Sequence, residues 1–254
     1  MYPVIRPLFG RNRRYSSVRF YLCDNLIAAS DPQCESRFFF SAAPRARLYY
    51  RPDGVRGRLE DVGRKYESGP VKVEARNFVV DVGANVGEFS SFSHERGARV
   101  LAIEPDPVPL EALKLNARGK RIEVIHRGLS DRAGVIPFYS SSESADSSFI
   151  EPLSYTHITN VSVVPLDELH TECSLPVIDF LKVEAEGYEP EVLLGSQAVL
   201  RNCAKVAVDV SPERRGESTW EPVRKILSEA GFTVWKEGIV AFAIREAARS
   251  KLES

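Results

Sequence analysis

The sequence predicts an α/β fold in which helices cover both faces of a mainly parallel β-sheet. The first observation is the run of residues 77–89, NFVVDVGANVGEF, in which an apolar strand passes through a glycine turn into a helix. The second is the run of residues 100–106, VLAIEPD, a further strand that ends in carboxylates. The third is the alternation of strand and helix signals along the rest of the chain, which a parallel sheet requires.

Apolar runs and their boundaries place the individual elements. We expect strands at residues 78–82, 99–103, 122–126, 177–183, 205–210, 232–235 and 240–244. We expect helices from the glycine turn to about residue 94 and at residues 110–117, 190–200 and 220–230. Pro190 suits a first helical turn, and Gly231 suits a helix end. The last two strands form a hairpin.

Two short additional strands, at residues 135–139 and 161–164, interrupt the alternation around a serine-rich loop, residues 140–148. A polar loop of this kind suits a lid or a substrate mouth. An inert surface hairpin is the alternative.

The glycine turn and the following strand end are typical of a nucleoside site. Gly83 and Gly87 lack Cβ atoms, so a ligand can approach the backbone closely. Glu104 is placed to accept hydrogen bonds from ribose hydroxyls. Asn85 stands where a dinucleotide site has its second glycine, and the carboxylate of Asp81 disfavours a pyrophosphate but attracts a sulfonium or ammonium group. These residues therefore predict S-adenosylmethionine as the cofactor.

Composition indicates an ordinary globular protein, with 43% hydrophobic and 27% charged residues among 254. The four cysteines show no C-x-x-C spacing, which argues against a zinc site and for a reducing compartment. Residues 1–30 match neither a signal peptide nor a membrane span. We therefore expect a cytoplasmic protein without a membrane span.

Charge divides the chain near the start of the glycine motif. Residues 1–76 carry 15 Lys and Arg against 8 Asp and Glu, whereas residues 77–254 carry 19 against 27. We expect a basic N-terminal extension (1–76), a catalytic domain (77–246) and a C-terminal tail (247–254). The basic extension either holds an anionic substrate, carrier or membrane surface, or faces the acidic catalytic domain. No basic and aromatic pattern of a nucleic-acid module is present in the sequence, so we expect no nucleic-acid partner.

A second group of candidate residues follows the strand at 177–183. Lys182 and Glu184 should face the same side of the sheet, so their ion pair is expected to orient an acceptor hydroxyl. Either Glu184 or Glu186 is then available to take its proton. One alternative is an ion pair at the surface that caps the next helix. A further alternative, which we do not favour, is a divalent metal ion held by Glu184 and Asp209.

The chain resembles the FkbM family of S-adenosylmethionine-dependent methyltransferases over residues 77–210. The resemblance is carried by the following motifs: DVGANVGEF (81–89), EPDP (104–107), LN (115–116), GLSD (128–131), LDEL (166–169) and LKVEAEGYE (181–189). It implies a Rossmann-like class I methyltransferase sheet of seven strands with an antiparallel last strand. It also implies O-methylation of a hydroxyl on a sugar, glycan or secondary metabolite. The family typically has Asp where this chain has Glu184, which puts a catalytic or metal-binding role at that position in question.

The loop after the third strand holds further candidates. Ser130 and Asp131 are placed to bond the adenine amino group if the loop closes over the ring. His126 is expected to be a hydrogen-bonded surface residue or to lie at the adenine edge. The predicted function is O-methyl transfer to a small-molecule or glycan acceptor. The alternatives are a nicotinamide-dependent oxidoreductase on a similar sheet and an inactive nucleoside-binding scaffold.

Overall fold

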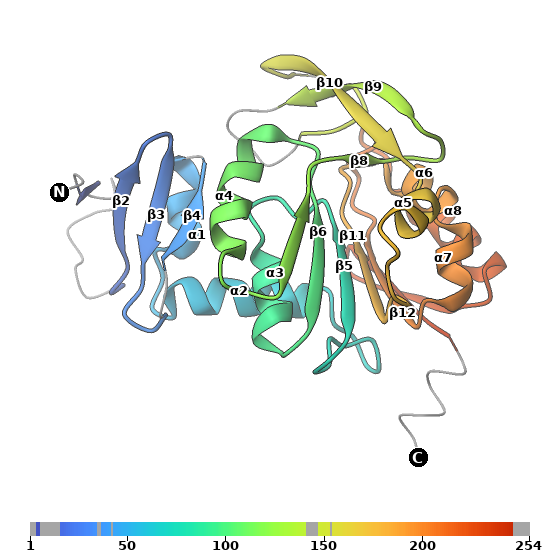
Figure 1. The fold of residues 1–254 in the computed structure, drawn as a ribbon, viewed down its shortest axis with the longest axis horizontal. Coiled ribbons are helices and arrows are strands. Elements are labelled where there is room, and N and C mark those ends of the chain that lie inside the picture. The colour runs from blue at the N-terminus through green and yellow to red at the C-terminus, as the bar shows by residue number, and fades with distance from the viewer. Residues whose placement is uncertain are drawn as a thin grey trace.

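A seven-stranded sheet forms the centre of the molecule, with strand order β13-β14-β12-β11-β5-β6-β7 (Figure 1). The computed structural model describes residues 4–5, 16–34, 37–41, 43–140, 147–152 and 154–245. Its central strands are β5 (Phe78–Val82), β6 (Arg99–Ile103), β7 (Ile122–Ile125), β11 (Phe180–Val183), β12 (Lys205–Asp209), β13 (Thr233–Glu237) and β14 (Val240–Ile244).

The directions of these strands agree with the fold that the resemblance implies. Strands β12, β11, β5, β6 and β7 pair in parallel, whereas β14 pairs antiparallel with both of its neighbours. The predicted mainly parallel sheet with an antiparallel last strand is therefore confirmed. Because the carboxyl ends of the parallel strands meet at one edge, the ends of β5, β6, β11 and β12 gather there.

The apolar runs form strands because both faces of the sheet are covered. All five residues of β5 are buried, and successive side chains enter two different cores. On one face Val80 and Leu181 pack with helices α5 (Leu166–Glu172), α6 (Glu189–Leu194), α7 (Gln197–Asn202) and α8 (Trp220–Glu229). On the other face Val79 and Phe180 pack mainly with helices α2 (Gly54–Lys65) and α3 (Glu88–Glu95), while α4 (Pro107–Ala117) covers β6 and β7.

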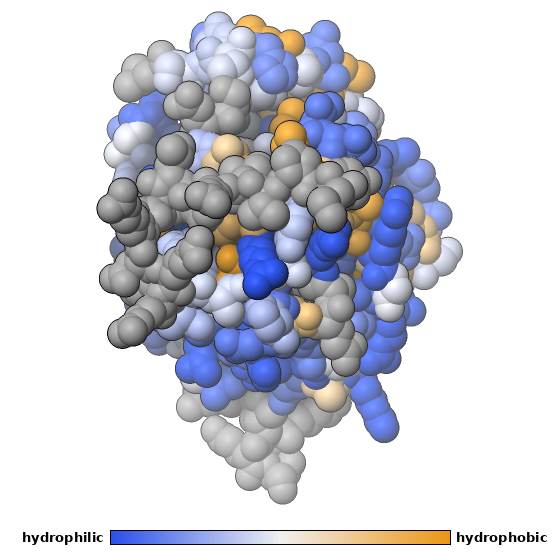
Figure 2. All heavy atoms as spheres, turned by 90° about the vertical axis from the view of Figure 1, so that its left-hand side faces the viewer, coloured by the Kyte–Doolittle hydropathy of each residue, from blue (hydrophilic) through white to orange (hydrophobic). Residues whose placement is uncertain are grey.

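The N-terminal region forms a small antiparallel sheet beside this second face (Figure 1). Its strands are β1 (Val4–Ile5), β2 (Arg19–Cys23), β3 (Leu26–Ser30) and β4 (Phe38–Phe40), followed by η1 (Ala43–Arg45) and α1 (Ala46–Tyr49). The side chain of Asn116 on α4 accepts a hydrogen bond from the Phe39 amide and donates one to the Phe39 carbonyl, both at 2.8 Å. Among the residues that carry a colour on this side of the molecule, hydrophilic ones predominate (Figure 2).

The residues expected to form a separate extension share a core with the catalytic sheet. Phe20 and Leu59 from the N-terminal region lie in one buried cluster with Phe89 and Phe180. Helix α2 packs along α3, so it takes the place of an ordinary covering helix of the sheet. The boundary at residue 76 therefore separates two stretches of sequence that are packed together through one hydrophobic core.

Several elements differ from the sequence-based expectation. Strand β11 starts at Phe180, three residues later than expected, and the helix expected at 190–200 is divided into α6 and α7. Helix α5 was not expected. The additional strands are β9 (Gly134–Ser140) and β10 (His157–Val164), and they form a second sheet with β8 (Gly128–Leu129).

Some expectations fall on residues that the structure does not describe. These are the C-terminal tail from residue 247 and most of the serine-rich loop, residues 141–146. Within the described ranges, none of the helices has the length and apolar character needed to span a bilayer.

Candidate functional site

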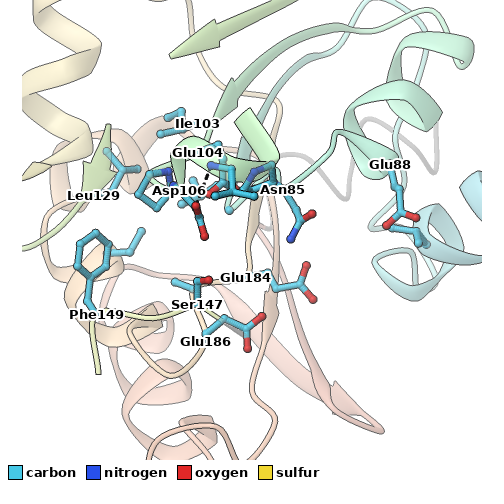
Figure 3. A pocket seen from close by; sticks show the side chains of 18 of the residues that line it. Asn85, Glu88, Ile103, Glu104, Asp106, Leu129, Ser147, Phe149, Glu184 and Glu186 are labelled. Carbon is cyan, nitrogen blue, oxygen red and sulfur yellow. Dashed lines mark hydrogen bonds between the residues drawn. The ribbon is translucent and has the colours of Figure 1, made fainter. Parts of the chain in front are cut away.

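A cavity of about 300 Å³ opens at the carboxyl ends of the parallel strands. Five of the residues singled out from the sequence line it: Gly83, Asn85, Glu104, Glu184 and Glu186. Figure 3 shows the side chains of Asn85, Glu104, Glu184 and Glu186 around one space, with Phe149 at one side and Glu88 at the other. The cavity therefore brings together residues from three strand ends that are far apart in the sequence.

The two glycines of the turn have different structural roles. Gly83 has a φ of +69°, and a Cβ atom there would lie 1.8 Å from the Glu184 carbonyl oxygen. Only glycine allows the ends of β5 and β11 to approach this closely. Gly87 has a φ of +85°, and its Cβ would meet Leu113 on α4 at 2.6 Å. Gly87 does not line the cavity, so it contributes to helix packing rather than to the cavity wall.

Glu104 is fixed at the end of β6 by two backbone amides. The amides of Asn85 and Asp106 donate to its two carboxylate oxygens at 2.6 and 2.8 Å (Figure 3). Burial raises the pKa of Glu104 to about 7, even though these two hydrogen bonds favour the ionised form. Glu104 lines the cavity. Its carboxylate is thus preorganised to accept hydrogen bonds there.

Asp81 does not line the cavity, contrary to the expectation. Its side chain is fully buried behind the turn. It forms an ion pair with Lys182 at 3.0 Å and accepts a hydrogen bond from Ser90 at 2.6 Å. The charge of Asp81 is therefore compensated inside the fold rather than presented to a ligand.

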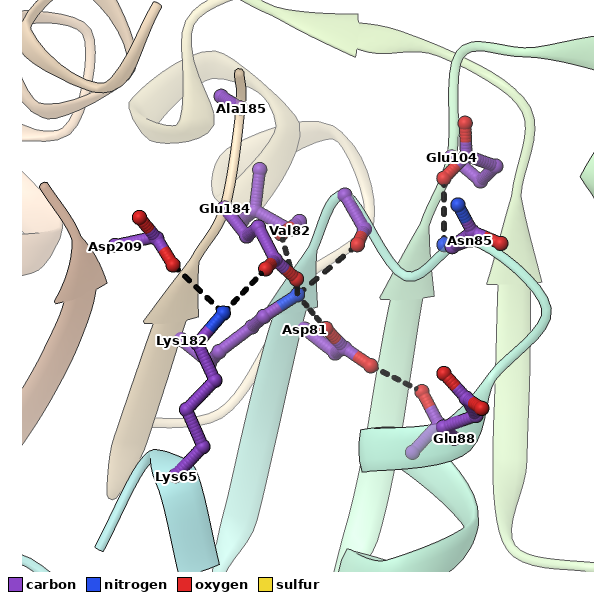
Figure 4. Close-up of polar contacts among 12 residues, drawn as sticks. Lys65, Asp81, Val82, Asn85, Glu88, Glu104, Lys182, Glu184, Ala185 and Asp209 are labelled. Carbon is purple, nitrogen blue, oxygen red and sulfur yellow. Dashed lines mark hydrogen bonds and ion pairs between the residues drawn. The ribbon is translucent and has the colours of Figure 1, made fainter. Parts of the chain in front are cut away.

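Lys182 is the centre of a buried charge network (Figure 4). The side chain is 2% exposed, and the ammonium lies 3.0 Å from Asp81 and 3.2 Å from Glu184. It also donates to the carbonyl oxygens of Val82 and Gly83 at 3.2 and 2.9 Å. Burial acts to lower its pKa, but the two carboxylates outweigh burial and raise it above its ordinary value. Lys182 therefore stays charged, and it orients Glu184.

Glu184 has a second cationic partner, which the sequence did not reveal. Lys65, the last residue of α2, lies 2.9 Å from Glu184 and 2.7 Å from Asp209 (Figure 4). Although burial acts to raise it, the ammonium groups of Lys182 and Lys65 lower the pKa of Glu184 to about 2. Glu184 is thus held ionised. The excess of basic residues in 1–76 was the only sequence signal that could have pointed to Lys65.

A different glutamate organises the loop after β11. Glu189 accepts hydrogen bonds from the amides of Ala185 and Gly187, both at 3.0 Å, and from Thr219 at 3.0 Å. The helix-capping alternative places the Lys182–Glu184 pair at the surface, before the next helix. That pair is instead largely buried beside the cavity.

The loop after β7 does not contribute its expected residues to the cavity wall. Ser130 is buried and its hydroxyl lies 3.0 Å from that of Tyr188, while Asp131 is exposed. His126 is exposed too, with its Nε2 atom 3.1 Å from the Pro105 carbonyl oxygen. The residues near this loop that line the cavity are Pro105, Asp106, Arg127 and Leu129.

The position between Glu184 and Asp209 is taken by an ammonium group. Lys65 contacts both carboxylates, so a divalent ion bound by this pair would have to displace Lys65. Among the described residues, no group of three or more His, Cys, Asp or Glu side chains is arranged to hold a metal ion.

The far end of the cavity is walled by the N-terminal region. Arg45 and Arg58 both contact Glu88, at 3.3 and 2.8 Å, and the Tyr49 hydroxyl donates to the same carboxylate at 2.7 Å. Basic residues of the extension thus pair with an acidic residue of the catalytic sheet region. These contacts fit the alternative in which the basic N-terminal region faces the acidic catalytic domain.

Comparison with known proteins places this architecture in a family. Residues 81–234 match the family model described as the methyltransferase FkbM domain. The 31-O-demethyl-FK506 methyltransferase FkbM of Streptomyces tacrolimicus is 28% identical over 214 residues, which cover 71% of this chain and 82% of that protein. The hexuronic acid methyltransferase AglP of Haloferax volcanii is 30% identical over 161 residues, which cover 63% of this chain and 64% of that protein.

A further relative is the methyltransferase sdnD of Sordaria araneosa, 26% identical over 206 residues that cover 63% of this chain and 75% of that protein. The family model spans more than half of the chain, from Asp81 in β5 into β13. The chain therefore belongs to the FkbM methyltransferase family.

Proposed function

We propose that this protein is an S-adenosylmethionine-dependent O-methyltransferase that acts on a hydroxyl group of a sugar, glycan or secondary metabolite. The observation that carries the proposal is the preorganised Glu104 carboxylate, which shares a cavity with the glycine turn and Glu184. Two relatives support the acceptor class, because their names refer to FK506 and to a hexuronic acid.

The cavity residues fit the cofactor. Glu104 is placed to accept hydrogen bonds from ribose hydroxyls, and Gly83 and Asn85 line the same cavity. When bound, S-adenosylmethionine supplies an electrophilic methyl group to a nucleophilic oxygen. The two backbone amides that donate to the Glu104 carboxylate and fix its orientation distinguish this site from a generic strand-end cavity.

Glu184 is the residue that we assign to the acceptor hydroxyl. Its side chain is 29% exposed and lines the cavity, while Lys182 and Lys65 hold both of its oxygens. A carboxylate whose pKa is about 2 is a weak base. We therefore assign Glu184 to orienting the hydroxyl by accepting its hydrogen bond, with the proton leaving as the new bond to oxygen forms. Glu186 also lines the cavity and is our candidate for the group that takes up this proton.

A methyl-transfer screen tests the proposal. The protein is incubated with methyl-labelled S-adenosylmethionine and a panel that includes glucuronic acid, galacturonic acid and hydroxylated polyketides. We expect label transfer to a hydroxyl of one acceptor, detected by mass spectrometry, and its loss in Glu184→Gln. Cofactor binding without transfer to any acceptor would support the inactive scaffold instead.

The same assay addresses the metal alternative. We expect activity to survive EDTA, because Lys65 rather than a cation links Glu184 and Asp209. Activity that disappears with EDTA and returns with magnesium would instead show a required ion.

A further inference from the structure

Five charged groups form one continuous network beneath the cavity. Asp81, Lys182, Glu184, Lys65 and Asp209 contact one another in that order, at 3.0, 3.2, 2.9 and 2.7 Å (Figure 4). They come from β5, β11, the loop after it, α2 and β12. Three carboxylates against two ammonium groups leave the network with one net negative charge, and Glu184 and Lys65 are the two members that line the cavity.

The position of Lys65 follows from the fold of the N-terminal region. Lys65 ends α2, where the helix dipole favours a cation. Its side chain is 33% exposed and lines the cavity, so the ammonium reaches the network from the ligand side. Lys182, in contrast, is 2% exposed and approaches from within the sheet.

We propose that Lys65 and Asp209 are positioning residues of this site: Lys65 fixes the Glu184 carboxylate toward the cavity, and Asp209 acts through Lys65. The inference rests on the proposed function and extends it to two residues outside the glycine and strand-end motifs. Lys182 holds one oxygen of Glu184 and Lys65 the other, so both are needed to fix the orientation of the carboxylate.

The buried carboxylate of Asp209 supports this arrangement, because Lys65 is the cation that it contacts. Its side chain is 1% exposed, and its charge is compensated by Lys65 and by the amide of Ser211 at 2.8 Å. Without Lys65, the network would hold three carboxylates around one ammonium, and a buried carboxylate without a cation takes up a proton near neutral pH. Loss of Lys65 should therefore make the charge beside the ligand depend on pH.

A pair of cofactor analogues tests this without any knowledge of the acceptor. Sinefungin carries an ammonium where S-adenosylmethionine carries its sulfonium, whereas S-adenosylhomocysteine is neutral there. The ratio of their affinities, measured by isothermal titration from pH 5 to 8, reports the charge near the transferred methyl group. Glu104 contributes equally to both affinities, so its titration cancels in the ratio. The titratable groups that face Glu184 are Asp81, Lys182, Lys65, Tyr66, Asp209 and Glu213.

In the wild-type protein we expect the ratio to stay constant, because Glu184 remains ionised over this range. In Lys65→Met the ratio should fall at least threefold between pH 8 and pH 5. Asp209→Asn, made in the otherwise wild-type protein, should also change the affinity ratio. Lys65→Arg keeps the positive charge and should show the constant ratio of the wild type. Lys225→Met, on the exposed side of α8, is the matched control.

A constant ratio in Lys65→Met would overturn the inference, and so would an equal, pH-independent loss of both ligands, which indicates a purely structural role. If the wild-type protein binds neither analogue, the proposed function itself fails and the inference falls with it. That outcome is distinct from a Lys65→Met variant that behaves as the wild type does.

Discussion

Ligand binding in the cavity is expected to depend on pH through the protonation of Glu104. Because burial raises its pKa to about 7, the free protein carries a proton on Glu104 below that pH. A ribose that donates hydrogen bonds needs the ionised form, so binding must then displace the proton. We predict that the affinity for S-adenosylhomocysteine falls as the pH drops below 7, toward a limit of about tenfold per pH unit for one linked proton.

The matched variants for this prediction are Glu104→Gln and Glu111→Gln. Glu104→Gln should weaken binding by about 1.5 to 3 kcal/mol at pH 8 and abolish the pH dependence, since a hydrogen bond to a charged group is lost. Glu111→Gln changes an exposed glutamate on α4 and should behave as the wild type does. An affinity that is independent of pH in the wild type would contradict the ionised role of Glu104.

Glu184 is expected to affect turnover rather than cofactor binding. Glu184→Gln keeps the shape of the side chain but removes the charge that two ammonium groups hold in place. We predict a fall in turnover of about 10²-fold or more, with the affinity for S-adenosylhomocysteine within about threefold of wild type. Glu184→Asp, which restores the residue typical of the family, shows whether the site is built around the longer side chain. Unchanged turnover in Glu184→Gln would remove this residue from the mechanism.

At the scale of elements, the contact between α2 and α3 decides where Lys65 lies. Gly63 on α2 faces Phe92 on α3, and a Cβ atom there would lie 2.3 Å from the ring. We predict that Gly63→Leu lowers the free energy of unfolding by about 1 to 3 kcal/mol through overpacking and shifts Lys65 away from Glu184. Urea unfolding measures the first effect. Arg64→Ala, at a neighbouring position that is 72% exposed, should change stability by less than about 0.5 kcal/mol.

The sequence predicted the elements well where local signals agreed with the tertiary structure. Strands β5, β6 and β14 have the expected bounds, because each is an apolar run between turn residues. The helix expected at 190–200 is interrupted at Gly195, where a Cβ would lie 2.0 Å from the Ser130 carbonyl oxygen. That contact comes from a segment 65 positions earlier in the chain, so no local pattern could reveal it.

Local sequence patterns also predicted only part of the cavity. Glu104 and Gly83 follow from motifs in which neighbouring residues define the geometry, and both line the cavity. Asp81 and Lys182 were expected to act toward ligands, but they compensate each other inside the sheet. Lys65 was missed because its role depends on contacts with Glu184 and Asp209, which come much later in the sequence.

At the scale of the whole molecule, the N-terminal region and the sheet should unfold together. Leu59 on α2 is 3% exposed and lies in the core cluster that also contains Phe180. We predict that Leu59→Ala lowers stability by about 2 to 5 kcal/mol and shifts the single unfolding transition seen in the fluorescence of Trp220 and Trp235. Arg47→Ala, at an exposed position of α1, is the control. A tryptophan transition that does not move would show that residues 16–76 unfold as a separate unit.

Ligand preference distinguishes a methyltransferase site from a nicotinamide-dependent oxidoreductase site. Isothermal titration of the wild-type protein at pH 8 with S-adenosylhomocysteine and with NADH compares the two nucleoside ligands that such a sheet can bind. We predict one molecule of S-adenosylhomocysteine bound per chain, a clear loss of affinity in Glu104→Gln, and no measurable binding of NADH. Binding of NADH without binding of S-adenosylhomocysteine would contradict the proposed use of S-adenosylmethionine.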